Sequence, residues 1–180
     1  MSIFKEDINR PLKEEFVILI LGPLFQIIFV NLYLNFNYSE NVYLLNNALL
    51  FFNLIPIYPL DGSKFLNIIL NKITSFKKSH ILTIYFSFIF MFLLIIKMNF
   101  NLIIIITILF TLIKVLEEFF KRNEIFNRFL LERYMKNYNF KKEIMVNDIK
   151  NMKRDYRHIF KEGNTYITEK QKLKKRFDFK

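Results

Sequence analysis

Long apolar segments alternate with short polar stretches through the first two thirds of the chain. A helix that spans a bilayer needs roughly 20 mainly apolar residues, and several of these segments approach that length. The pattern predicts an all-α, polytopic membrane protein with about four crossings. The predicted crossings cover residues 16–36, 42–70, 80–96 and 100–116.

The second apolar segment is too long and too interrupted for one straight helix. Pro56 and Pro59 each lack an amide donor, and each moves the preceding residue away from helical geometry. We therefore expect a helix that ends at Asn53, an extended stretch over 55–60, and a new helix over 62–72. Extended backbone at membrane depth persists only where protein covers it or a wet cavity lies beside it. The break is consequently the place where a site is expected.

An acidic residue, Asp61, follows this break. A carboxylate within an apolar segment is costly unless it binds something, so Asp61 is a functional-site candidate. Two interpretations stay open from the residues alone. Asp61 caps the new helix by accepting backbone amide protons, with Gly62 permitting the turn, or it is a ligand or an ionisable functional group. Asn53 could likewise simply cap the preceding helix.

Positive charge is concentrated after the last apolar segment. Residues 117–180 contain 18 Lys and Arg against 10 Asp and Glu, within a net charge of +11 for the whole chain. The predicted organisation is a membrane domain over 1–116 and a basic tail over 117–180. The positive-inside rule places both the N-terminus and this tail in the cytoplasm. We expect contact with the lipid bilayer, and no nucleic-acid partner.

Within the tail, an apolar face recurs at helical spacing and is surrounded by cations. Two arrangements stay open for this helix: it lies on the membrane surface, or it packs against the membrane domain or a partner. The tail over 117–180 is expected to be short, cytoplasmic and α-rich; residues 140–180 are expected to form a small, weakly hydrophobic element whose fold stays open, with His158 solvated. The apolar face comprises Phe126, Phe129, Leu130 and Tyr134, and the cations are Arg122, Arg128, Arg133 and Lys136.

The run from Asn53 through Pro56 to Pro59-Leu60-Asp61-Gly62 resembles the metal-binding segment of the site-2 proteases, a family of intramembrane zinc metalloproteases. Ser63 stands where that family has a second glycine. The resemblance implies that Asp61 is the third protein ligand to zinc. It also implies that the active site is lined by Asn53, Pro56, Pro59 and Gly62.

Two further stretches extend the resemblance. Gly22-Pro23-Leu24 is similar to a Gly-Pro helix of the family, with Gln26 where Asn is usual. Residues 129–134 and 156–158 are similar to the branch that includes the stage IV sporulation protease. This branch implies a bacterial inner-membrane location and regulated intramembrane proteolysis, with a precursor of a sporulation transcription factor as the substrate.

The chain departs from the family in lacking a His-Glu-x-x-His helix, which supplies two zinc ligands and the general-base Glu. Catalytic zinc normally has three protein ligands and one open position. Only His80 and His158 are present, there is no cysteine, and Glu14 and Glu15 have no histidine beside them. We expect no catalytic residue in this chain, no zinc bound by the chain alone, and no proteolysis by it alone.

Three functions are therefore considered. The first is most of an intramembrane metalloprotease that cleaves a transmembrane or membrane-tethered protein, with the missing helix lost through a misplaced start codon or frameshift, or separately encoded as an N-terminal piece. The second is a non-catalytic pseudoprotease that binds a transmembrane partner. The third is a plain membrane anchor in which the motif is only a helix break.

Overall fold

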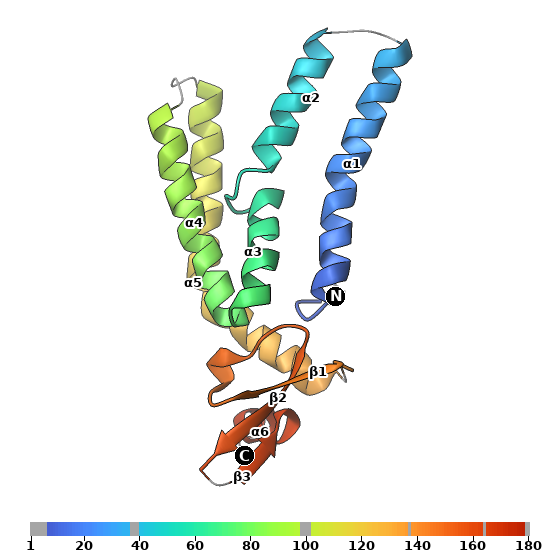
Figure 1. The fold of residues 1–180 in the computed structure, drawn as a ribbon. Helices are drawn as coiled ribbons and strands as arrows, with labels where there is room; N and C mark the ends of the chain where they lie inside the picture. Colours follow the sequence, from blue (N-terminus) through green and yellow to red (C-terminus); the bar gives the residue numbers. More distant parts are fainter. Residues whose placement is uncertain (1–6, 37–39, 98–101, 137, 164, 179–180) are drawn as a thin grey trace.

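The computed structural model describes residues 7–36, 40–97, 102–136, 138–163 and 165–178. Five long helices form a bundle, and a small α/β module lies at the end of the bundle that also holds the N-terminus (Figure 1). The bundle helices are α1 (Leu12–Phe36), α2 (Glu40–Asn53), α3 (Asp61–Ile73), α4 (Phe76–Lys97) and α5 (Leu102–Met135). The module contains β1 (Lys142–Val146), the 3-10 helix η1 (Ile149–Asn151), β2 (Tyr156–Glu162), β3 (Thr165–Thr168) and α6 (Glu169–Phe177).

Two helices are long and apolar enough to cross a membrane: Leu12–Tyr33 within α1 and Phe76–Ile96 within α4. Their large apolar side chains point outward, since Phe29 is 67% exposed and Phe92 64% exposed. Apolar surface of this extent is typical of contact with lipid. Within the described residues, only these two helices are long and apolar enough to cross a membrane. The presence of about four crossings therefore stays a prediction.

The predicted helix break is confirmed. The helix α2 ends at Asn53, and α3 begins at Asp61 and continues in the same general direction (Figure 1). Because α1 contacts both α2 and α3, and α4 contacts both α3 and α5, the break lies inside the bundle. The N-terminus and the C-terminal module share one end of the bundle (Figure 1). That this end is cytoplasmic stays a prediction.

A stripe of small polar residues lets α4 approach its neighbours closely. Ser79, Thr83 and Ser87 are buried and lie one turn apart. Their hydroxyls donate to the carbonyls of Phe76, Ser79 and Thr83, each at 2.9 Å. Small residues at helix contacts permit close packing within a membrane, and these internal bonds satisfy their polar atoms.

The tail is rich in helix, as predicted, but the prediction of an all-α fold is wrong there, because residues 142–168 contain a three-stranded sheet. Strand β2 is central, pairing in parallel with β1 and antiparallel with β3. Along β2 the side chains alternate, with His158 and Phe160 buried and Arg157 and Lys161 exposed. Alternation of this kind is the sequence signature of a half-buried strand.

The end of α5 packs on this module, so its apolar face does not lie on the membrane surface. Phe129 and Leu130 are fully buried in one cluster with Phe160 and Leu173 of the module. Phe76, at the start of α4, stacks on Phe129 with ring centroids 4.2 Å apart. The cluster therefore connects the module to the bundle. The helix α5 is continuous through residues 116 and 117. The predicted boundary between a membrane domain and a tail at this point stays a prediction.

Candidate functional site

The backbone between α2 and α3 is held in place by α4. The amide of Tyr58 donates to Ser87 Oγ at 3.0 Å, and Ile57 is buried against Ile84 and Val115. Within the break, the Leu60 amide donates to the Ile57 carbonyl at 2.8 Å. The peptide bond between Tyr58 and Pro59 is cis. Protein therefore covers this non-helical backbone, as the membrane interior requires.

Gly62 lets the chain fold back on itself at the start of α3. A Cβ atom added at this position would collide with the backbone carbonyl oxygens of Leu54 and Ile55. Gly62 is itself buried. The glycine is therefore required by close backbone approach, because no side chain fits between the two segments.

Asp61 is the first residue of α3 and does not cap it. The N-cap is Leu60, and no side chain caps the helix. The Asp61 carboxylate accepts from Lys64 Nζ at 3.0 Å, and its side chain is 36% exposed. A carboxylate in the first turn still interacts favourably with the helix dipole. The capping interpretation of Asp61 is thus wrong, and the ligand interpretation stays a prediction.

The other predicted site residues lie on the same short segment. Asn53 is the last residue of α2, and Pro56 and Pro59 lie in the break. All three are half-buried. The structure thus brings them to one place in the bundle with Asp61 and Gly62. Their predicted contribution to an active-site wall stays a prediction.

A cavity of about 210 Å³, lined by both polar and apolar side chains, lies beside the break, between α3, α4, α5 and the N-terminal segment. His80 Nε2 is 3.5 Å from Glu118 Oε1, and Tyr58 shares a side-chain hydrogen bond with the same Glu118. His80 was expected at a helix start; α4 begins four residues earlier, at Phe76, and the His80 side chain lines this cavity. Sequence reasoning missed the grouping, because the three residues are far apart in the chain. The cavity is also lined by Ser63, Lys64, Asn67, Thr83, Glu15 and Arg154.

The side chains described here do not form a zinc site by themselves. Over the described ranges, no group of three His, Cys, Asp or Glu residues lies close enough to hold a metal ion. At the position implied by the resemblance there is one carboxylate, Asp61, and it is paired with Lys64. Catalytic zinc normally takes three protein ligands. No zinc-dependent step is therefore derived from this chain alone.

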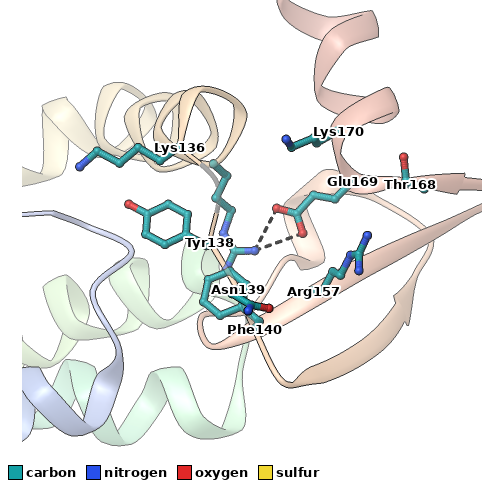
Figure 2. Close-up of a pocket in the computed structure, with 9 residues that line it drawn as sticks. Lys136, Tyr138, Asn139, Phe140, Arg157, Thr168, Glu169 and Lys170 are labelled. Atoms are coloured by element: carbon teal, nitrogen blue, oxygen red, sulfur yellow. Dashed lines mark hydrogen bonds and ion pairs between the residues drawn. The ribbon is translucent and has the colours of Figure 1, made fainter.

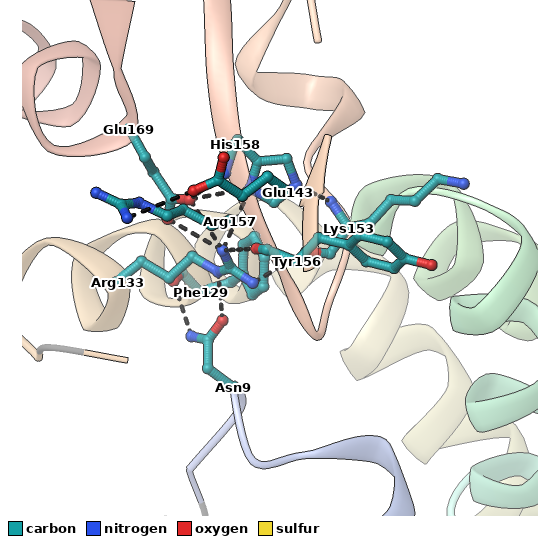
Figure 3. Close-up of polar contacts among 9 residues, drawn as sticks. All are labelled: Asn9, Phe129, Arg133, Glu143, Lys153, Tyr156, Arg157, His158 and Glu169. Atoms are coloured by element: carbon teal, nitrogen blue, oxygen red, sulfur yellow. Dashed lines mark hydrogen bonds and ion pairs between the residues drawn. The ribbon is translucent and has the colours of Figure 1, made fainter. Parts of the chain in front are cut away.

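A second group of polar side chains lies outside the bundle, in the C-terminal module. A pocket of about 370 Å³ opens beside the end of α5 (Figure 2). Arg133, one of the residues that line it, is 3% exposed and binds four segments of the chain at once (Figure 3). It donates to Asn9 Oδ1 at 2.7 Å, to the Lys153 and Tyr156 carbonyls at 2.9 Å, and to Glu169 Oε1 at 3.0 Å.

His158 is buried in this network, so its expected solvated position is wrong. The Lys153 amide donates to Nε2 at 2.9 Å, which leaves the ring proton on Nδ1. Nδ1 then donates to Glu169 Oε2, with 3.0 Å between the two atoms. Burial lowers the pKa of His158, against the opposing effect of Glu169. Burial alone would raise the pKa of Glu169, but the hydrogen bond to His158 and the charge of Arg133 together lower it.

Acidification is expected to destabilise the C-terminal module. The pKa of His158 lies below its ordinary value of 6.5, so the unfolded chain takes up the proton first and stability falls as the pH drops below 6.5. The lowered pKa of Glu169 acts in the same direction below its ordinary value of 4.5. Thermal unfolding followed between pH 8 and pH 5, about the range in which histidine titrates, checks this. His158→Gln should flatten the dependence, and a wild-type midpoint independent of pH would contradict it.

Comparison with known proteins bears on the break directly. Residues 36–97, which contain it, match the model of peptidase family M50. The chain is 34% identical over 138 residues to "Stage IV sporulation protein FB" of Bacillus subtilis (strain 168). The chain is a homologue of the M50 peptidases, the site-2-protease family. The resemblance carried by Asn53, Pro56, Pro59 and Asp61 is thereby confirmed, and so is the similarity to the stage IV sporulation branch.

The match to the Bacillus protein covers 70% of this chain and 48% of that protein. The chain thus spans about half the length of this curated relative. Membership of a membrane-protease family and the two apolar helices α1 and α4 together indicate a membrane location. An inner-membrane location stays a prediction.

Proposed function

We propose that this chain forms the Asp61-bearing part of an intramembrane metalloprotease. The observation that carries the proposal is a carboxylate at the start of a helix, directly after a backbone break inside an apolar bundle, within the residues that match peptidase family M50. Asp61 supplies one zinc ligand. The remaining ligands and the general-base Glu come from a His-Glu-x-x-His helix outside these 180 residues, and the isolated chain is inactive.

The substrate in this proposal is a transmembrane or membrane-tethered protein. Hydrolysis within a membrane needs polar groups beside the bond that is cleaved, and the cavity beside Tyr58 and Ser63 supplies polar side chains next to the helix break. The similarity to a sporulation protein supports a role in sporulation, with the membrane-tethered precursor of a transcription factor as the substrate.

A second candidate function is that of a pseudoprotease, which contains no metal and binds a transmembrane partner. The ion pair between Asp61 and Lys64 favours it, since a carboxylate already paired with a cation is a poorer metal ligand. The two functions differ in what the complex contains. A metalloprotease complex binds zinc through Asp61, whereas a pseudoprotease complex retains its partner without zinc.

Asp61→Asn is expected to lower zinc affinity by at least about tenfold and to abolish cleavage in the assembled protease, because the amide removes an anionic ligand. The test co-produces the chain with a second membrane polypeptide that carries a His-Glu-x-x-His helix of an M50 peptidase. Zinc per purified complex and cleavage of a membrane-tethered reporter are then measured.

Lys64→Gln is the matched control, since it removes the ion pair and leaves the carboxylate available. Zinc content in this variant should equal or exceed that of the wild type. Equal zinc content and equal cleavage in the Asp61→Asn complex would refute the ligand role. A complex that forms but takes up no zinc, with or without Asp61, would favour the pseudoprotease.

A further inference from the structure

Glu118 of α5 is an acidic residue that the bundle keeps largely away from solvent. Its side chain is 16% exposed and lines the cavity beside the break. The preceding residue, Glu117, is 42% exposed and is bound by Lys114 and Lys121. A carboxylate held among the helices of an apolar bundle is costly, so the contacts that Glu118 makes indicate what it does there.

Glu118 contacts the break on one element and α4 on another. Tyr58, in the break, shares a side-chain hydrogen bond with Glu118. The phenol hydroxyl is the donor and the carboxylate is the acceptor. His80 Nε2, on α4, lies 3.5 Å from Glu118 Oε1, and the His80 ring stacks on Phe76. The carboxylate is thereby confined between the break and the start of α4.

Tyr58 is held at two points by two different helices. Its amide donates to Ser87 Oγ of α4 at 3.0 Å, and its hydroxyl is bound by Glu118 of α5. A single backbone contact would let the residue pivot about that point. The second contact, through the hydroxyl, therefore fixes the orientation of Tyr58 in the break.

The backbone between Tyr58 and α3 has little slack. The Leu60 amide donates to the Ile57 carbonyl at 2.8 Å. The amide and the hydroxyl of Ser63 both donate to the Leu60 carbonyl, at 3.1 Å and 2.7 Å. These bonds tie the break to the first turn of α3, where Asp61 lies. A displacement of Tyr58 is consequently passed on to Asp61.

We propose that Glu118 is a positioning residue for Asp61 and acts through the Tyr58 hydroxyl. By holding Tyr58, Glu118 ties the start of α3 to α5 and fixes where the Asp61 carboxylate is presented. In this role Glu118 contacts no substrate. The role rests on the proposed function, in which Asp61 belongs to the active site of a protease.

The first test follows the start of α3 directly and needs no activity. The chain contains no cysteine, so Lys64→Cys takes a single nitroxide label in the first turn of α3, at a side chain that is half-exposed. Electron paramagnetic resonance spectra are recorded on the full chain in nanodiscs. We expect Tyr58→Phe and Glu118→Leu each to shift the spectrum toward a more mobile label.

Three further variants separate the contact with Tyr58 from a general effect. Glu118→Gln keeps an acceptor oxygen for the hydroxyl, so its spectrum should match the wild type. Glu117→Leu makes the same substitution one residue away, at a carboxylate with surface ion pairs, and should leave the spectrum unchanged. The double variant Tyr58→Phe, Glu118→Leu should shift it no further than either change alone, because both remove one contact.

The second test is cleavage of the membrane-tethered reporter by the assembled protease. Tyr58→Phe and Glu118→Leu should lower kcat by roughly tenfold or more and leave KM within about twofold, since a misplacement of about 1 Å can cost about a hundredfold in rate. Glu118→Gln should recover most of the loss. A wild-type complex that cleaves nothing would count against the proposed function alone, because the spectra still decide whether Glu118 holds the start of α3.

Three results would overturn the positioning role. The first is the same spectrum for Glu118→Leu as for Glu117→Leu. The second is a shift in Glu118→Gln as large as that in Glu118→Leu, or an additive shift in the double variant, because either would show that Glu118 does not act through the Tyr58 hydroxyl. The third is cleavage at the wild-type rate by a variant whose spectrum has shifted.

Discussion

Gly62→Ala is expected to cost about 3 kcal/mol of stability, at the upper end of what overpacking a tight contact costs. The added Cβ would meet the backbone oxygens of Leu54 and Ile55, which a rotamer change cannot move. The start of α3 must then shift away from the break, carrying Asp61 with it. A lowered midpoint of thermal unfolding in detergent, followed by circular dichroism, is the measurement.

Gly22→Ala provides the matched control, since Gly22 lies within α1 and a Cβ there meets no atom within 4 Å. Alanine favours a helix over glycine by up to about 1 kcal/mol, so this variant should be neutral or slightly more stable. If the two variants unfold at the same temperature, the close approach at Gly62 does not stabilise the break. Comparing the two variants also separates the effect of the close contact at Gly62 from the general effect of replacing a glycine in this protein.

The helix break was predictable because the residues that cause it act locally. Pro56 and Pro59 constrain their own backbone and that of the residue before them, whatever packs around them. The end of α2 at Asn53 and the start of α3 at Asp61 follow from that constraint. The capping role of Asp61 stayed open, because a cap requires a non-helical backbone and a side chain oriented toward the first amides, and the residue type specifies neither; the N-cap is Leu60.

The sheet in the tail was missed because its strands are short and only partly apolar. Strand β2 does alternate between buried and exposed side chains, and in the sequence it is followed by a Gly-Asn pair of a kind typical of hairpin turns. The helical spacing of Phe126, Phe129 and Leu130 just upstream favoured a helical interpretation of the whole tail. Phe160 and Leu173 cover that apolar face. Both are distant from it in sequence, so no local pattern predicts the contact.

The residues of the candidate site also differ in whether the sequence alone could indicate them. The Asn53-to-Gly62 segment carries its predicted chemistry in ten neighbouring positions, so the sequence alone is enough to propose it. The cavity that brings His80, Glu118 and Tyr58 together, and the network around Arg133, join residues from separate elements. Their grouping follows from how the helices pack, and a single sequence gives only their residue types.

Arg133→Met is the second substitution with a large expected effect, a loss of about 3–5 kcal/mol, as is typical when one partner of a buried ion pair is removed. Methionine keeps much of the side-chain volume but leaves Glu169 without its cation. It also removes the bonds to Asn9, before α1, and to the Lys153 and Tyr156 carbonyls. The module should therefore loosen from both the N-terminal segment and α5.

Hydrogen exchange of the module is the measurement that separates this effect from a change in the bundle. Protection should fall across β1, β2 and α6 and stay unchanged in α4. Arg157→Gln is the control, because Arg157 is exposed and its contact with Glu143 is 3.5 Å long, so it should change stability by less than about 1 kcal/mol. Adding Glu169→Gln to Arg133→Met should restore part of the loss, since it removes the uncompensated charge. Equal protection in wild type and Arg133→Met would show that the module stays docked through its apolar cluster alone.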